Sequence, residues 1–348
     1  MVSGLLQPIK ILMITFTVSS ISACSNQNEI FSTPASTLAT GDSIYNQSSS
    51  NETNKNINIS FLDKDASIKL LATEDEYIQA LSPFDWQAKF KSGRKLSPKE
   101  LEGYYSKAAI NWDTESKEKV LTAVKLLQDK ISKLNINAPK NIKFVLTNGL
   151  VESGAAYTRE DYIVLTPELL EDSQSEINAL VAHEFFHVYS RYNQAHRDKL
   201  YSTVNFKKIA PLVLPNEIDA LRITNPDSPK MGYAIDLDYQ GQQLTFLPLL
   251  KAFSKYDMAS NLSFFAYLQD GLLAVQSDKG ITRPLLIENK PLFIPKTETN
   301  YDAVVLPNAE YLNHPEEVLA SNFALWVTDA AIEHEAPVEK LIMVMKSI

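Results

Sequence analysis

The sequence has one cysteine, no cluster of lysine and arginine, and no apolar run long enough to cross a bilayer. Its 348 residues carry a formal net charge of −9. A general nucleic-acid-binding role is disfavoured, because such proteins attract phosphates with clustered positive charge. The hydrophobic content of 45% and the charged content of 22% are ordinary for a soluble globular protein, so the chain can bury a substantial core.

Residues 1–23 have the pattern of an export signal, with Lys10 before a short apolar run and small residues at the end. The segment Ile21-Ser22-Ala23-Cys24 resembles a bacterial lipobox, in which the cysteine is lipidated and becomes the mature N-terminus. The resemblance implies a lipid anchor at Cys24 on the extracytoplasmic side of the cell envelope, in the outer membrane where one is present. A plain secretory peptide with an incidental cysteine is the alternative.

The rest of the chain divides by composition and periodicity. Residues 24–60 are dominated by Ser, Thr, Asn and Gln, which predicts a disordered tether. Residues 61–139 place apolar side chains at three- and four-residue spacing, which predicts a helical segment that packs on the domain that follows it. Residues 140–348 are expected to form that domain, and the overall fold class is expected to be α+β.

Several short elements are predicted within the last segment. Alternating and apolar runs predict a strand over 142–147, a hairpin over 155–166 and further strands after residue 233. Small residues at 154–156 indicate a free sheet edge that could pair with a substrate backbone. We also predict a broken helix over 206–221, a strand over 264–268 and a turn at Asp270-Gly271.

The strongest functional signal is the stretch from residue 175 to residue 193. At its centre is His183-Glu184-Phe185-Phe186-His187, an H-E-x-x-H pattern. On a helix the two histidines lie on one face, where both imidazoles can reach a single ion. Zinc suits this geometry, and Glu184 is placed to act as the general base that takes a proton from water.

The alternative interpretation of the motif is a pair of core histidines. Burying two histidines and a glutamate without a metal or other partners costs several kcal/mol, which favours the metal site.

A catalytic zinc requires a third protein ligand. The metzincin class would continue the helix with Gly and His where this chain has Ser190 and Asn193, so that class is excluded. The segment from Asn313 to Ala324 has Pro315 near its start, acidic residues in its first turn and an apolar stripe, which predicts a second amphipathic helix. Its two acids are Glu316 and Glu317.

With these two motifs the chain resembles the gluzincin metallopeptidases, in which a glutamate on a later helix completes the zinc site. Their pattern of Glu, a small residue and Asp is matched by Glu317, Ala320 and Ser321. The resemblance implies that His183, His187 and Glu317 bind Zn²⁺, with Glu316 as the alternative ligand. Ser321 departs from the pattern, so another carboxylate must orient the ligand imidazole or the site is weakened.

The resemblance also implies a zincin-like catalytic domain. Glu317 lies 130 residues after His187, so a β-rich insertion is expected between the two helices. The implied function is that of a membrane-tethered, extracytoplasmic zinc hydrolase acting on a peptide or protein substrate. A hydrolase of a non-peptide amide uses the same groups. An envelope-assembly or binding lipoprotein with a structural or inactive zinc site is the alternative from another class.

Such a hydrolase needs a donor that stabilises the oxyanion. The candidates by residue type are Tyr233, Tyr311, His196 and His314.

Overall fold

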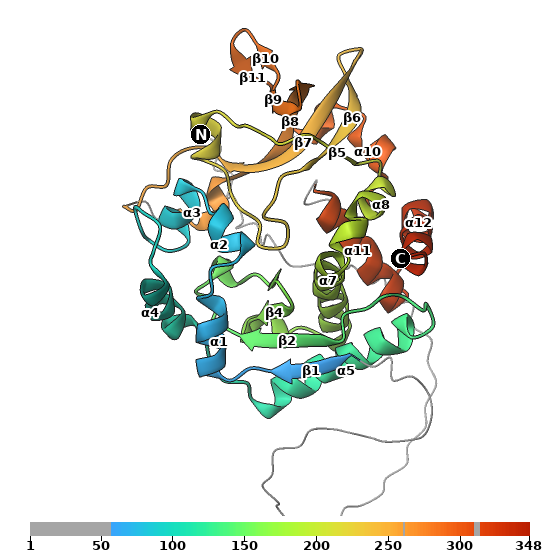
Figure 1. Cartoon of the computed structure of the whole chain (residues 1–348). Helices are drawn as coiled ribbons and strands as arrows, with labels where there is room; N and C mark the ends of the chain where they lie inside the picture. The colour runs from blue at the N-terminus through green and yellow to red at the C-terminus, as the bar shows by residue number, and fades with distance from the viewer. Residues whose placement is uncertain (1–56, 260–261, 310–313) are drawn as a thin grey trace, which may run out of the picture.

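Two helices that are far apart in the sequence, α7 (Gln174–Tyr192) and α11 (Pro315–Thr328), lie side by side in the middle of the molecule. The computed structural model describes residues 57–259, 262–309 and 314–348. A small sheet lies on one side of these helices and a larger β-rich part on the other (Figure 1). The export signal, Cys24 and nearly all of the predicted tether lie outside the described residues. Among the helices of the described part, none has the length and hydropathy needed to cross a membrane.

The small sheet has the strand order β1-β2-β4-β3 and consists of β1 (Asn58–Phe61), β2 (Asn141–Leu146), β3 (Tyr157–Arg159) and β4 (Tyr162–Leu165). Alternate side chains of β2 and β4 point to opposite faces. Phe144 and Ile163 join the core beneath α5 and α7, whereas Val145 and Val164 face the N-terminal helices. The N-terminal elements are β1 (Asn58–Phe61), α1 (Lys64–Leu71), α2 (Glu76–Ala80), α3 (Pro83–Ala88), α4 (Pro98–Ala108) and α5 (Thr114–Ile131).

The helical segment was predicted well in its local detail. Ser97 and Glu100 form a capping box at the start of α4, and Pro83 is in the first turn of α3. The end of the tether was wrong, because residues 58–61 form β1, which pairs in parallel with β2. The alternating pattern of these four residues is too short to have been recognised as a strand.

The helix that carries the H-E-x-x-H motif follows the hairpin of the small sheet after one short helix, α6. The middle elements are β2 (Asn141–Leu146), η1 (Glu152–Gly154), β3 (Tyr157–Arg159), β4 (Tyr162–Leu165), α6 (Pro167–Leu170), α7, η2 (Gln194–His196) and α8 (Arg197–Ser202).

The expected insertion between the two motif helices is a six-stranded sheet with short connections. Its elements are β5 (Lys207–Lys208), α9 (Asn216–Asp219), β6 (Tyr233–Tyr239), β7 (Gln242–Ala252), η3 (Phe264–Tyr267), β8 (Leu268–Asp278), β9 (Ile281–Pro284), β10 (Leu286–Ile287), β11 (Lys290–Pro291), β12 (Phe293–Ile294) and η4 (Lys296–Glu298). The chain ends with α10 (Tyr301–Val305), α11 and α12 (Glu335–Lys346).

Three local predictions in the insertion were wrong. Residues 206–221 contain the short strand β5 and the four-residue helix α9 in place of the predicted helix, because Pro211 and Pro215 cannot continue a helix. Residues 264–267 form the 3₁₀ helix η3. Gly271 lies inside β8, where a Cβ atom would come within 2.6 Å of the Phe293 ring, so the glycine allows close packing of two strands and makes no turn.

The insertion and the rest of the chain share one hydrophobic core. Phe246 and Ala274 on the inner face of the large sheet belong to the same buried cluster as Val124 of α5, Phe186 of α7 and Leu319 of α11. The mixed helix and strand content agrees with the α+β prediction. The position of the motif helices between two sheets is therefore fixed by packing on both sides.

Candidate metal centre

The helix α7 begins with a capping box, in which the Ser173 hydroxyl accepts from the backbone of Glu176 and the Glu176 carboxylate accepts from the backbone of Ser173. From Ile177 onward most of the helix is buried against α5, α11 and the small sheet. His183, Glu184 and His187 are all buried, with at most 4% of each residue exposed. Ring centroids of the two histidines are 4.8 Å apart, as expected for neighbours on one helix face.

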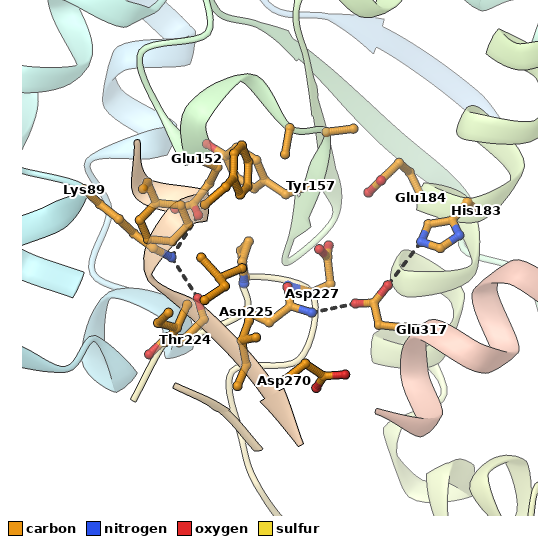
Figure 2. A pocket seen from close by; sticks show the side chains of 18 of the residues that line it. Lys89, Glu152, Tyr157, His183, Glu184, Thr224, Asn225, Asp227, Asp270 and Glu317 are labelled. Carbon is orange, nitrogen blue, oxygen red and sulfur yellow. Dashed lines mark hydrogen bonds and ion pairs between the residues drawn. The ribbon is translucent and has the colours of Figure 1, made fainter. Parts of the chain in front are cut away.

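The carboxylate of Glu317 lies between the two imidazoles. Its Oε2 atom is 3.3 Å from Nε2 of His183 and 3.7 Å from Nε2 of His187. Figure 2 shows the Glu317 side chain directed at the His183 ring. Ligand atoms on a tetrahedral zinc, with bonds of about 2.0–2.1 Å, are separated by roughly 3.3 Å. The observed spacing therefore fits three ligands of one zinc ion.

Nε2 of His187 provides a test of this fit. It is buried and has no hydrogen-bond partner among the described residues. An unpaired buried polar atom is destabilising, and a metal ion in contact with this nitrogen would satisfy it. The donor set, two imidazoles and one carboxylate, matches one of the three-ligand sets known from zinc enzymes.

Glu316 has a different position from its neighbour. Its Oε1 atom is 3.1 Å from Nδ1 of His187, on the far side of that ring from Glu317. Its Oε2 atom accepts hydrogen bonds from Ser190, at 2.8 Å, and from Tyr201. Consecutive residues on a helix point about 100° apart, so the two carboxylates reach opposite edges of one imidazole. Glu316 thus supplies the orienting carboxylate that Ser321 cannot supply.

Two neighbouring segments hold the remaining carboxylates. Thr158 on β3 donates its hydroxyl to Oε2 of Glu184 at 2.6 Å, and Asn225 donates its amide to Oε1 of Glu317 at 2.5 Å. Asp227 is a further buried acid. One oxygen of its carboxylate, one carboxylate oxygen of Glu184 and one ring nitrogen of His187 lie within 4.8 Å of one another. Sequence reasoning missed Thr158, Asn225 and Asp227, because no motif marks residues that reach the site from a strand and a loop.

Glu316 and Glu317 are held in the ionised form, whereas burial, together with the charges of Glu184 and Glu317, raises the pKa of Asp227. Burial raises the pKa of Glu317, but His187, His183 and the Asn225 amide outweigh it and lower the pKa to about 2. For Glu316, burial likewise raises the pKa, and the bond to His187 with the charge of Arg197 lowers it to about 2. Both carboxylates are therefore ionised at neutral pH, and the space between the helices favours a cation.

A cavity of about 200 Å³ opens beside these residues. His183, Glu184 and Glu317 form one end, whereas Lys89 and Glu152 form the other, where they make an ion pair of 2.8 Å (Figure 2). Most of the wall between the two ends is apolar. It includes Ala155, Ala156, Leu180, Ile223, Pro226, Leu250, Phe264, Phe265 and Leu268.

Three of the four candidates for oxyanion stabilisation lie within the described residues, and none of these three lines the cavity. Tyr233 donates its hydroxyl to Asp198 at 2.6 Å, and His314 accepts from the backbone of Glu316 at the start of α11. His196 lies in η2, and Tyr311 lies outside the described residues. The tyrosine that lines the cavity is Tyr157 of β3.

Comparison with known protein families, with curated proteins and with solved structures finds no match to this chain.

The two adjacent glutamates allow a matched test of the site. We expect Glu317→Gln to lose stoichiometric zinc, because it removes a ligand charge. Glu316→Gln should keep one zinc per chain with an affinity reduced by about 10- to 100-fold, because only the orientation of His187 is affected. Competition with a calibrated chelator measures the zinc affinity of both variants, and thermal unfolding checks that each variant is folded.

Glu118→Gln, an exposed site on α5, is the control. The assignment would be reversed if Glu316→Gln lost zinc while Glu317→Gln bound it as tightly as the parent protein.

Proposed function

We propose that the protein is a zinc-dependent peptidase. The observation that carries the proposal is the convergence of Nε2 of both histidines on one oxygen of Glu317, at 3.3 and 3.7 Å, with Glu184 beside them and a cavity in front. A structural zinc site is closed by four protein ligands. Among the described residues, the groups that could hold a metal combine three side chains each, which supports a position left open for water and substrate.

Zinc held by His183, His187 and Glu317 would polarise a scissile carbonyl and lower the pKa of water. Glu184 then acts as the general base: its carboxylate takes a proton from the attacking water and passes it to the nitrogen of the leaving amine. The water oxygen bonds to the carbonyl carbon as the C–N bond breaks. The hydrogen bond from Thr158 holds the Glu184 carboxylate in a fixed orientation during these transfers.

The cavity supports a substrate with an apolar group next to the scissile bond. Leucine, isoleucine, alanine and phenylalanine side chains line its walls. An apolar substrate group in contact with them removes apolar surface from water, which favours binding. A non-peptide amide would meet the same catalytic groups, and a binding lipoprotein would use the cavity without turnover.

The activity test is the substitution of the general base. Glu184→Gln keeps the size of the side chain and its acceptor for Thr158, so zinc content should be unchanged. Hydrolysis of a mixed peptide pool should fall by about 10²- to 10⁴-fold, the usual contribution of general-base assistance. Mass spectrometry of the pool and metal analysis of the protein give the two readouts.

Glu118→Gln should behave as the parent in both assays. A parent protein that binds zinc but leaves every peptide in the pool intact would favour the binding-lipoprotein alternative. Equal hydrolysis by the parent and Glu184→Gln would remove Glu184 from the mechanism.

We further propose that Cys24 carries a lipid that anchors this peptidase in the cell envelope. Only the thiol can accept the acyl-glyceryl group, so Cys24→Ala should lose lipid labelling and leave the membrane fraction. Unchanged labelling and membrane retention of Cys24→Ala would contradict the lipobox interpretation.

A further inference from the structure

The strand β3 lies at the edge of the small sheet, directly beside the candidate metal centre. It pairs with β4 across a two-residue turn, with Arg159 opposite Tyr162 and Tyr157 opposite Val164. In an antiparallel ladder, the backbone groups of alternate residues point toward and away from the partner strand. Thr158 therefore directs its N–H and C=O groups away from β4. Ala156 immediately precedes β3, and the same alternation continued past the strand would direct its N–H and C=O groups the same way.

The outward groups of Thr158 are already bonded. Its N–H donates to Oδ1 of Asp227 at 2.6 Å, and its C=O accepts from Nη2 of Arg191 at 2.9 Å. The same Nη2 atom donates to the carbonyls of Pro226 and Asp227, each at 2.8 Å. Arg191 thus fastens the segment around Asp227 over the edge of β3, and a peptide lying along this edge could not extend past Thr158.

Ala156 lies on the open side of this barrier. It lines the cavity, and its methyl group leaves space for another main chain to approach. A peptide segment that pairs antiparallel with β3 runs from the Thr158 side toward Ala156. Its amino end would therefore meet the barrier, and its carboxyl side would extend along the open edge.

The carboxylates at this barrier favour the amino end of a bound peptide over its carboxyl end. Asp227 and Glu184 have carboxylate oxygens within 4.8 Å of one another and of a nitrogen of His187, and Glu317 is on the adjacent helix (Figure 2). The two charges of one zinc ion and the charge of Arg191 balance these three carboxylates overall. Glu184, Asp227 and Glu317 line the cavity, however, whereas Arg191 does not, so the charged side chains that face this end are carboxylates. Lys89 belongs to the other end of the cavity, where its charge is paired with Glu152. A terminal carboxylate would be repelled at this barrier, whereas an ammonium group would be attracted.

We propose that the end of the cavity closed by Asp227 and Arg191 binds the free α-ammonium group of a peptide, with Asp227 as its acceptor. On this proposal the protein removes residues from the amino end of its substrates. The inference rests on the proposed peptidase function and names its substrate class. The water oxygen adds to the carbonyl carbon of a residue near the amino end, and the released nitrogen, with the proton from Glu184, becomes the amino terminus of the shortened peptide.

The first test compares two peptides of identical sequence, one with a free amino terminus and one acetylated. The parent protein should shorten the free peptide from its amino end, with kcat/KM about 10- to 100-fold above that of the acetylated peptide, because a charged hydrogen bond is lost on acetylation. Mass spectrometry identifies the products. Internal cleavage at equal rates in both peptides would overturn the inference and leave the peptidase function intact.

A second test measures binding without turnover. The zinc-loaded Glu184→Gln variant should bind the free peptide about 10- to 100-fold more tightly than the acetylated one in a calorimetric titration. Adding Asp227→Asn should abolish this preference, because the amide retains an oxygen for the Thr158 N–H but loses the charge. Adding Asp270→Asn, which removes a carboxylate elsewhere in the same cavity, should leave the preference in place.

The outcomes separate the two proposals. A preference for the free amine that depends on Asp227, in a protein that cleaves no peptide, would support the binding site and contradict the peptidase function. Loss of the preference in Asp270→Asn as much as in Asp227→Asn would assign the effect to the total charge of the cavity and overturn the role of Asp227. The comparison of the two peptides with the parent protein needs no variant, so it remains decisive even where Asp227→Asn is unstable.

Discussion

The candidate site depends on the packing of α7 against α11. These helices are separated by more than 120 residues, and each supplies only part of the ligand set. Phe185 on α7 stacks on Phe323 of α11 with ring centroids 5.7 Å apart, and both side chains are fully buried. This contact sets the distance and rotation of the two helices. A ligand set of two imidazoles and one carboxylate forms only when that geometry brings Glu317 between His183 and His187.

The hydrogen bonds around the site orient three of its side chains, the proposed ligands His187 and Glu317 and the proposed base Glu184. Glu316 fixes the His187 ring, Asn225 fixes Glu317, and Thr158 fixes Glu184. Two of these partners come from segments outside the motif helices, and Asn225 belongs to the connection between α9 and β6 within the β-rich insertion. The insertion therefore helps to build the site, because Asn225 orients Glu317 and the segment around Asp227 covers the edge of β3 at one end of the cavity.

The sequence predicted those features whose causes are local. Two histidines four residues apart share a helix face in any helix, and a capping box marks a helix start wherever it occurs. The role of Glu316 was not predictable, because the one-residue difference between a ligand and an orienting group depends on the rotation of α11 against α7. Gly271 was misassigned for a similar reason: its close contact with Phe293 exists only in the folded sheet. Asp227 was missed because nothing in its sequence surroundings indicates that it meets β3.

The central claim is that His183, His187 and Glu317 hold one zinc ion with a position left open. X-ray absorption at the zinc edge of the purified protein tests it directly. The account predicts about one zinc per chain, two imidazole nitrogens at roughly 2.0–2.1 Å, and carboxylate and solvent oxygens completing the shell. A protein that retains no transition metal during chelator-free purification, or a zinc ion enclosed by four protein ligands, would contradict it.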